Sequence, residues 1–251
     1  MRIGLLGAGN LARALALGLG EPVAVYDPVL ERAQELAERT GGRAYSSTQA
    51  VSEVAEITVL CHKPAQLESV AESFESNGRR ILSALGATPL DALRAAYPHA
   101  TVARIMPNIA MEIGDGLTIL CSPAPGTLER ELADEVASIL GGIGRVVELD
   151  ESMLPLAQGT SGGMPAYVAL IIEAYVDALV RQGMPQEIAL EVVAGSIPGS
   201  AKLIAARGGD TLGVRRQVTS PGGTTARAIR ALDAGGVREA IAEAVDASII
   251  R

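Results

Sequence analysis

Two patterns of hydrophobic and polar positions divide the chain. In the first part, short runs of branched apolar residues alternate with longer stretches whose apolar residues recur every three or four positions. The short runs predict strands and the stretches predict amphipathic helices. The predicted strands are Arg2–Leu6, Pro22–Tyr26, Ile57–Cys61, Arg80–Ala84, Thr101–Ile105, Gly116–Cys121 and Arg145–Leu149, and the predicted helices are Asn10–Gly18, Pro28–Thr40, Gln66–Ser76, Pro89–Tyr97 and Gly126–Leu140. This alternation predicts a parallel sheet with helices on both faces.

No strand pattern follows Asp150. Helical periodicity runs through the rest of the chain, with prolines where helices open and glycines where they end. The predicted helices are Met164–Arg181, Pro185–Arg207, Thr224–Asp233 and Val237–Ile250. We therefore expect an α/β fold, with a Rossmann-type doubly wound sheet at residues 1–152 and an all-helical dimerisation domain at residues 153–251.

The helix predicted at 165–180 carries apolar residues on nearly every face, including Leu170, Ile171 and Val176. A two-layer monomer would leave part of such a helix in water. The sequence therefore predicts a homodimer or higher homo-oligomer through the second domain. Because the helix contains Glu173 and Asp177 and is short, we do not expect it to span a bilayer.

Composition and charge restrict the class of partner. The 251 residues include six aromatic side chains and no Trp, and 21 basic against 29 acidic residues give a net charge of −8. The chain thus lacks the basic excess that nucleic acid or an anionic membrane surface requires. Two cysteines, Cys61 and Cys121, lie in apolar runs without metal-ligand spacing. This usage is typical of a reducing compartment, so we expect a cytoplasmic protein without a metal site.

A glycine turn follows the first predicted strand and opens the first helix. It reads Gly7, Ala8, Gly9, Asn10, Leu11 and Ala12. The first glycine permits the tight turn, the second lets the backbone approach a pyrophosphate, and a small third residue allows close packing of helix on strand. Asp27 closes the second predicted strand, where a carboxylate can bind the adenosine ribose hydroxyls. The sequence therefore predicts a dinucleotide site, and the alternative is a glycine turn without a ligand.

A second glycine turn leads into a helix of the second domain. It reads Thr219, Ser220, Pro221, Gly222, Gly223, Thr224 and Thr225. Exposed backbone amides and two hydroxyl residues at a helix start favour an anion such as a substrate carboxylate. The alternative is that these hydroxyls merely cap the helix.

Further motifs occur between the two turns. These are His62-Lys63-Pro64, Arg104-Ile105-Met106-Pro107-Asn108 and Ser161-Gly162-Gly163-Met164-Pro165-Ala166-Tyr167. Together with both turns they make the chain resemble the pyrroline-5-carboxylate reductase family over essentially its full length. The chain departs from the family pattern at Ile109-Ala110, Gly163-Met164 and Val237.

The resemblance implies hydride transfer from NAD(P)H to a cyclic imine, giving L-proline, at an interlocked dimer interface. It assigns substrate binding to Ser220, Gly222, Gly223, Thr224 and Thr225, with Thr225 as the catalytic residue at the ring nitrogen. It assigns cofactor binding to Gly7, Ala8, Gly9, Asn10, Leu11, Asp27, His62, Lys63, Pro64, Pro107 and Asn108. His62 could also be an ordinary polar residue at a turn, and Lys63 a solvated charge.

The acidic charge at Asp27 favours NADH, because the extra phosphate of NADPH would face a like charge. The alternative is that Asp27 turns outward and Arg32 reaches that phosphate. Two other functions remain open from the sequence. One is a reductase of another cyclic imine, and the other is a non-catalytic nicotinamide-binding sensor of the same fold.

Overall fold

The computed structural model describes residues 2–249, which divide into two compact units. The first unit comprises the residues up to Pro165 together with Ser248, and the second is Ala166–Ala247. The boundary predicted at residues 152 and 153 precedes this division by a short helical segment. Ile250, the predicted end of the last helix, lies outside the described residues.

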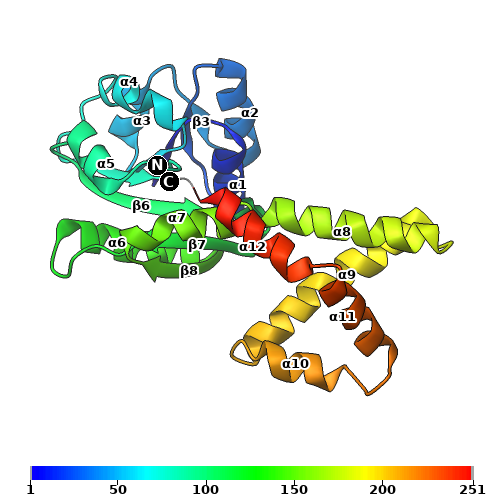
Figure 1. Cartoon of the computed structure of the whole chain (residues 1–251). Helices are drawn as coiled ribbons and strands as arrows, with labels where there is room; N and C mark the ends of the chain where they lie inside the picture. The colour runs from blue at the N-terminus through cyan, green and yellow to red at the C-terminus, as the bar shows by residue number, and fades with distance from the viewer. Residues whose placement is uncertain (1, 250–251) are drawn as a thin grey trace. The chain divides into compact units, whose positions relative to one another are not determined.

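Within residues 2–249, eight strands of the first unit form one sheet in the order β3-β2-β1-β4-β5-β6-β7-β8 (Figure 1). The strands are β1 Ile3–Leu6, β2 Ala24–Tyr26, β3 Arg43–Ala44, β4 Ile57–Leu60, β5 Arg80–Ser83, β6 Thr101–Pro107, β7 Gly116–Cys121 and β8 Gly144–Leu149. From β3 to β6 every pair is parallel, so the carboxyl ends of these strands meet at one edge. The predicted α/β doubly wound fold is confirmed.

The sheet is not parallel throughout. β7 pairs antiparallel with β6, with Met106 opposite Ile119, and β8 then runs parallel to β7. The prediction of an all-parallel sheet was wrong at this pair. The connection from β6 to β7 holds only the 3-10 turn Ile109–Ile113, which is too short for a crossover helix, so the chain reverses.

Both faces of the sheet are covered by helices. Successive strand residues alternate between two buried clusters: Leu5 and Val59 belong to one, and Leu6 and Leu60 to the other. The helices of this unit are α1 Asn10–Leu19, α2 Leu30–Thr40, α3 Thr48–Val54, α4 Leu67–Ala71, α5 Leu90–Ala96, α6 Leu128–Gly141 and α7 Leu154–Ala157. The strand β3 and the helix α3 were not predicted, because each has too few residues for a period to emerge.

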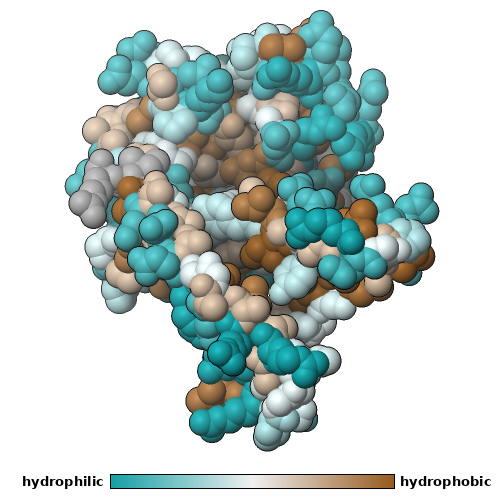
Figure 2. Space-filling model, turned by 45° about the vertical axis from the view of Figure 1, so that its right-hand side comes forward, coloured by the Kyte–Doolittle hydropathy of each residue, from teal (hydrophilic) through white to brown (hydrophobic). Residues whose placement is uncertain are grey.

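The second unit is helical and has little core of its own. Its helices are α8 Met164–Arg181, α9 Gln186–Ala206, α10 Thr211–Gln217, α11 Thr224–Ala234 and α12 Val237–Ser248, of which α10 was not predicted. Within Ala166–Ala247 only Val176, Ala189 and Val193 are buried. Large apolar side chains lie in water instead, and the space-filling view shows hydrophobic residues at the surface (Figure 2). A unit of this size needs another surface to cover it.

One helical stretch of the chain is longer than its sequence pattern predicts. Helical turns run on without a break from Glu151 to Arg181, and this stretch and α9 are long and apolar enough to cross a membrane by length and composition. The prediction that the helix at 165–180 is too short was therefore wrong, because it omitted the turns before Pro165. These criteria do not distinguish a membrane span from a helix that packs against another copy of the chain, because both need an apolar surface.

A single acidic substitution tests whether this surface binds another copy. Leu170 on α8 is 66% exposed, and Leu128, the first residue of α6 in the other unit, is 65% exposed. We expect Leu170→Asp to dissociate the oligomer, because an unpaired carboxylate costs several kcal/mol when it is buried. Leu128→Asp is the matched control and should leave the molar mass by light scattering unchanged. An unchanged mass for Leu170→Asp would exclude α8 from the interface.

Candidate cofactor and substrate sites

The glycine turn between β1 and α1 lies against the end of β4. Gly7 has a φ of +113°, and a Cβ there would lie 2.8 Å from the carbonyl oxygen of Cys61. Only glycine fits this position. Gly9 precedes α1 and provides no side-chain cap, and a Cβ on it would meet no atom within 4 Å. The start of α1 is therefore exposed and its first amides have no side-chain cap, as the binding of a pyrophosphate requires.

A cavity of about 590 Å³ opens beside this turn at the carboxyl edge of the sheet. It is bordered by the ends of β1, β2 and β4 and by the loops that follow them. Its lining includes Gly7, Gly9, Tyr26, Asp27, Pro28, Val29, Arg32, Ser46, Ser47, Thr48, Cys61, His62, Lys63, Gln66 and Ser69. Ligands of open α/β sheets bind at such an edge. The uncapped helix start, the close-packed glycine and the two cations Arg32 and Lys63 fit a dinucleotide.

Asp27 joins the glycine turn to the end of β2. Its side chain is 9% exposed, and its Oδ2 accepts a hydrogen bond from the Ala8 amide at 2.8 Å. Its Oδ1 accepts another from the Val29 amide at 2.9 Å. A carboxylate oxygen has two acceptor positions, so each can still accept from a ribose hydroxyl. Asp27 thus holds the turn in shape and also borders the cavity.

His62 forms part of the cavity wall after β4. Its Nδ1 lies 2.9 Å from the carbonyl oxygen of Lys63, and since a carbonyl only accepts, Nδ1 carries the proton. Its Nε2 is buried and has no hydrogen-bond partner among residues 2–249. Burial lowers the pKa of the ring from its ordinary value of 6.5, and the Lys63 contact opposes this in part. The ring therefore favours its neutral form.

The other predicted cofactor residues divide into two groups. Lys63 borders the cavity, and its amide donates to Oε1 of Gln66 at 3.1 Å, while Pro64 opens the 3-10 turn that follows. Pro107 and Asn108 do not line this cavity. Asn108 instead accepts from the Leu117 amide at 3.2 Å and donates to the Ser161 carbonyl at 3.4 Å, so it ties β6 and β7 to the segment before α8.

The second predicted turn occurs in the helical unit. Gly223 donates its amide to the Ser220 carbonyl at 3.1 Å, and Gly222 has a φ of +69°. Gly223 precedes α11 without a side-chain cap, and a Cβ on it would collide with the Ser220 hydroxyl. Thr224 and Thr225 are the first residues of α11. This places hydroxyls and uncapped amides together, as the binding of a carboxylate requires.

Several residues in these regions were not predicted. Arg227, in the first turn of α11, donates from Nη1 to the Gly222 carbonyl at 2.8 Å and brings a positive charge to the turn. Ser47 lines the dinucleotide cavity and accepts from the Ala50 amide at 3.1 Å as the cap of α3. The three hydroxyl residues Ser46, Ser47 and Thr48 are a visible capping signal that the sequence analysis did not use.

Two family profiles match the chain. One is described as pyrroline-5-carboxylate reductase dimerisation and covers residues 151–251. The other is described as NADP oxidoreductase coenzyme F420-dependent and covers residues 2–86. The first match includes the helices α8 to α12, whose large apolar side chains are exposed. The second includes the glycine turn at Gly7 and Asp27.

Curated relatives align with the whole chain. The pyrroline-5-carboxylate reductase of Escherichia coli is 33% identical over 97% of this chain and 94% of the relative. That of Synechocystis is 31% identical over 100% of this chain and 97% of the relative.

Solved structures of the same class superpose closely. The 1-pyrroline-5-carboxylate reductase of Streptococcus pyogenes has a TM-score of 0.88 at 27% identity, with 99% of this chain and 96% of that one covered. The Plasmodium falciparum pyrroline carboxylate reductase, solved with NADP bound, has a TM-score of 0.86 at 25% identity, with 99% and 95% covered. A reductive aminase of Aspergillus terreus, at 18% identity and a TM-score of 0.55 over 82% of this chain and 76% of that one, shares the fold alone.

The environment of His62 predicts a pH dependence of stability. Because its pKa is lowered in the fold, the unfolded chain binds more protons once the pH falls below about 6.5, and the fold then loses stability. His62→Gln should therefore reduce the fall in melting temperature between pH 7.5 and 5.5. His99→Gln, at the exposed second histidine, is the control and should leave this fall unchanged. An identical fall in wild type and His62→Gln would show that the ring titrates normally.

Proposed function

The chain belongs to the pyrroline-5-carboxylate reductase family and is thus an NAD(P)H-dependent oxidoreductase producing L-proline, and we propose how its own residues carry out this reduction. The observation on which the proposal rests is the intact turn from Ser220 to Thr225 at the start of α11. Its uncapped amides and hydroxyls supply the carboxylate site that the substrate requires, and the cavity at Gly7 supplies the cofactor site.

The reaction adds a hydride to carbon and a proton to nitrogen, so the only acid that it needs from the protein is one donor at the ring nitrogen. The bound nicotinamide cofactor supplies the hydride, and a protonated imine is already electrophilic at carbon. The backbone and hydroxyls of Ser220, Gly222, Gly223 and Thr224 bind the carboxylate and fix the orientation of the ring. Thr225 is the catalytic residue, because its hydroxyl hydrogen-bonds the ring nitrogen as the imine becomes an amine.

Arg227 supports an anion at this turn. Its Nη1 donates to the Gly222 carbonyl oxygen at 2.8 Å. This oxygen therefore does not accept from the amides of the turn, which stay available to a carboxylate. The charge also adds to the favourable dipole at the start of α11. Arg227 is therefore a positioning residue of the substrate site.

The cofactor residues follow the cavity from β2 to β4. Asp27 binds the adenosine ribose, and the amides of Gly9, Asn10 and Leu11 face the pyrophosphate. Ala8 contributes through its own amide, which donates to Asp27 and so fixes the turn. The nicotinamide half is bound by His62, Lys63 and Pro64 after β4. Further along the cofactor come Pro107 and Asn108 at the end of β6. NADH is favoured over NADPH, because a 2′-phosphate would lie beside the Asp27 carboxylate in a partly dry groove.

The active form is a homodimer or larger homo-oligomer joined through residues 153–251. The small buried core of Ala166–Ala247 and its exposed apolar side chains support this. Dissociation abolishes activity in this proposal, since the substrate site is completed at the interface. The net charge of −8 supports the absence of nucleic acid and of anionic membrane surfaces as partners, and the reducing-compartment usage of the two cysteines supports the cytoplasm.

The reaction itself is tested by the absorbance of reduced cofactor. Addition of pyrroline-5-carboxylate should lower the absorbance at a rate proportional to the enzyme. Faster turnover of a six-membered cyclic imine would identify a reductase of another imine. Cofactor binding without oxidation by either imine would favour the non-catalytic sensor.

Thr225→Ala should lower kcat roughly 100- to 10,000-fold, the usual contribution of a positioned proton donor. The Kd of the reduced cofactor should stay within about twofold, because Thr225 does not line the cavity at the glycine turn. Thr211→Ala, at the start of α10, is the matched control and should retain full activity. A Thr225→Ala enzyme within a factor of two of wild type would remove Thr225 from the mechanism.

Cofactor choice is tested at Asp27. The wild type should show a higher kcat/KM with NADH than with NADPH, and Asp27→Ser should shift the ratio toward NADPH as the like charge is removed. Asp27→Asn removes the same charge but keeps the size of the side chain and one acceptor oxygen, so it retains one of the two contacts to Ala8 and Val29 that Asp27→Ser loses. A wild-type preference for NADPH would contradict the proposal and would indicate that Arg32 in the cavity wall binds the phosphate.

A further inference from the structure

The loop between β5 and α5, residues 84–89, lies next to the end of β4. The Ala84 amide donates to the Leu60 carbonyl at 3.1 Å, one residue before the Cys61 backbone that contacts Gly7. A dinucleotide bound with its ribose at Asp27 on β2 and its phosphates at the glycine turn extends toward β4 and β5. The loop is therefore at the nicotinamide end of the proposed cofactor site.

One residue of this loop has an unfavourable backbone conformation. Ala87 has a φ of +54°, and among residues 2–249 it is the only one other than glycine with a positive φ. The left-handed region brings the Cβ too close to the following carbonyl oxygen. Such a conformation persists only where surrounding contacts enforce it.

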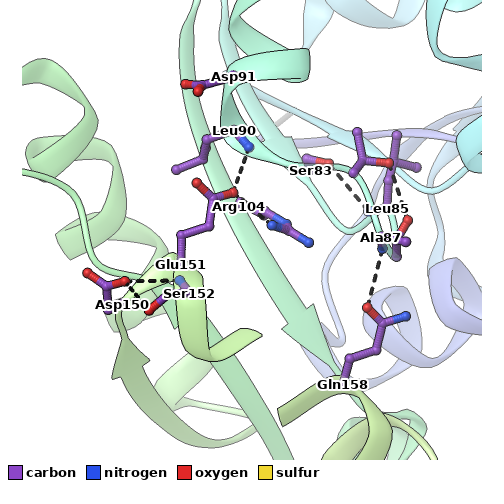
Figure 3. Close-up of polar contacts among 12 residues, drawn as sticks. Ser83, Leu85, Ala87, Leu90, Asp91, Arg104, Asp150, Glu151, Ser152 and Gln158 are labelled. Atoms are coloured by element: carbon purple, nitrogen blue, oxygen red, sulfur yellow. Dashed lines mark hydrogen bonds and ion pairs between the residues drawn. The ribbon is translucent and has the colours of Figure 1, made fainter. Parts of the chain in front are cut away.

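Two side chains from the segment before α8 hold the loop. Oε1 of Gln158, in the π-helical turn Gln158–Gly162, accepts from the Ala87 amide at 3.3 Å (Figure 3). Oε1 of Glu151 accepts from the Leu90 amide at 2.6 Å, where the loop enters α5. Both anchors are therefore made to backbone amides on either side of Pro89.

The Glu151 anchor is fixed by a buried cation. Arg104 on β6 is 5% exposed and donates from Nη1 to the same Glu151 oxygen at 2.8 Å (Figure 3). A charge buried in this way holds its partner closely, because separation would leave it unpaired. The Gln158 anchor has no such support.

Packing holds only part of the loop. Leu85 and Thr88 are buried, whereas Ala87 and Pro89 are exposed. A cavity of about 350 Å³ borders the exposed part and is lined by Ala87, Pro89, Arg104, Glu151, Pro155 and Gln158 among others. The backbone around Ala87 therefore has room to relax toward an ordinary conformation when an anchor is lost.

We propose that Gln158 is a positioning residue that, together with Glu151, holds loop 84–89 in the conformation that receives the nicotinamide half of the cofactor. The inference rests on the proposed function only in so far as the cavity at Gly7 binds a nicotinamide dinucleotide. It concerns binding of that half and not the identity of the imine.

Gln158→Leu tests the proposal, because it keeps the size of the side chain and removes the acceptor. Binding should be measured with two probes, NADH and ADP-ribose, of which the second lacks the nicotinamide. Gln158→Leu should weaken NADH binding between about five- and thirtyfold, corresponding to the cost of a left-handed alanine that is no longer held. ADP-ribose binding and the melting temperature should stay as in wild type.

A second substitution reverses the effect if strain is the cause. Glycine adopts a positive φ at no steric cost, so Ala87→Gly combined with Gln158→Leu should recover part of the lost NADH affinity. Gln34→Leu, on the exposed side of α2, is the matched control and should change neither probe. Unchanged NADH binding in Gln158→Leu, or an equal loss for both probes, would overturn the proposal, as would a double variant no better than Gln158→Leu.

These outcomes are independent of catalysis. A chain that binds NADH but reduces no imine would contradict the proposed reaction and still report on Gln158. Wild type that binds ADP-ribose and NADH equally would overturn the role of the loop, because the nicotinamide would then contribute nothing to affinity.

Discussion

The close approach of the Gly7 turn to the end of β4 is the constraint on which the first unit depends. It brings backbone to within contact distance of the Cys61 carbonyl, where no side chain fits. The Asp27 carboxylate holds the turn from the other side through the Ala8 amide. Since β1 lies between β2 and β4 in the sheet, these contacts align three strand ends around one cavity. The position of the amides at the start of α1 follows from this alignment.

The same carboxylate has two functions that draw on one charge. As an acceptor of two backbone amides it stabilises the turn, and charge-assisted hydrogen bonds of this kind are among the stronger ones in proteins. The carboxylate also lines the cavity, where its negative charge disfavours a phosphate beside the ribose. A substitution at Asp27 therefore alters the shape of the site together with its charge. Comparing Asp27→Asn, which keeps the size of the side chain, with the smaller Asp27→Ser helps to separate the two effects.

The second unit depends on assembly for a different reason. Three buried residues cannot offset the conformational entropy of ordering five helices, whereas the exposed apolar side chains of α8 and α9 can do so once they are covered. The match of residues 151–251 to a dimerisation family agrees with this balance. The segment with Glu151 and Gln158 occurs at the start of that match, but it belongs to the first unit, where it anchors loop 84–89.

The sequence by itself determined the features that depend on near neighbours along the chain: the strand and helix periods, the glycine turn with Asp27 after the second strand, and the Ser220 to Thr225 turn before a helix. These signals are local, because the steric freedom of glycine and the spacing of apolar residues act over a few positions. Only the tertiary structure decided the reversed direction of β7, the amide partners of Asp27, the Arg227 contact and the strained Ala87. Each of these depends on which backbone groups meet in space, and neither composition nor periodicity specifies which distant groups will meet.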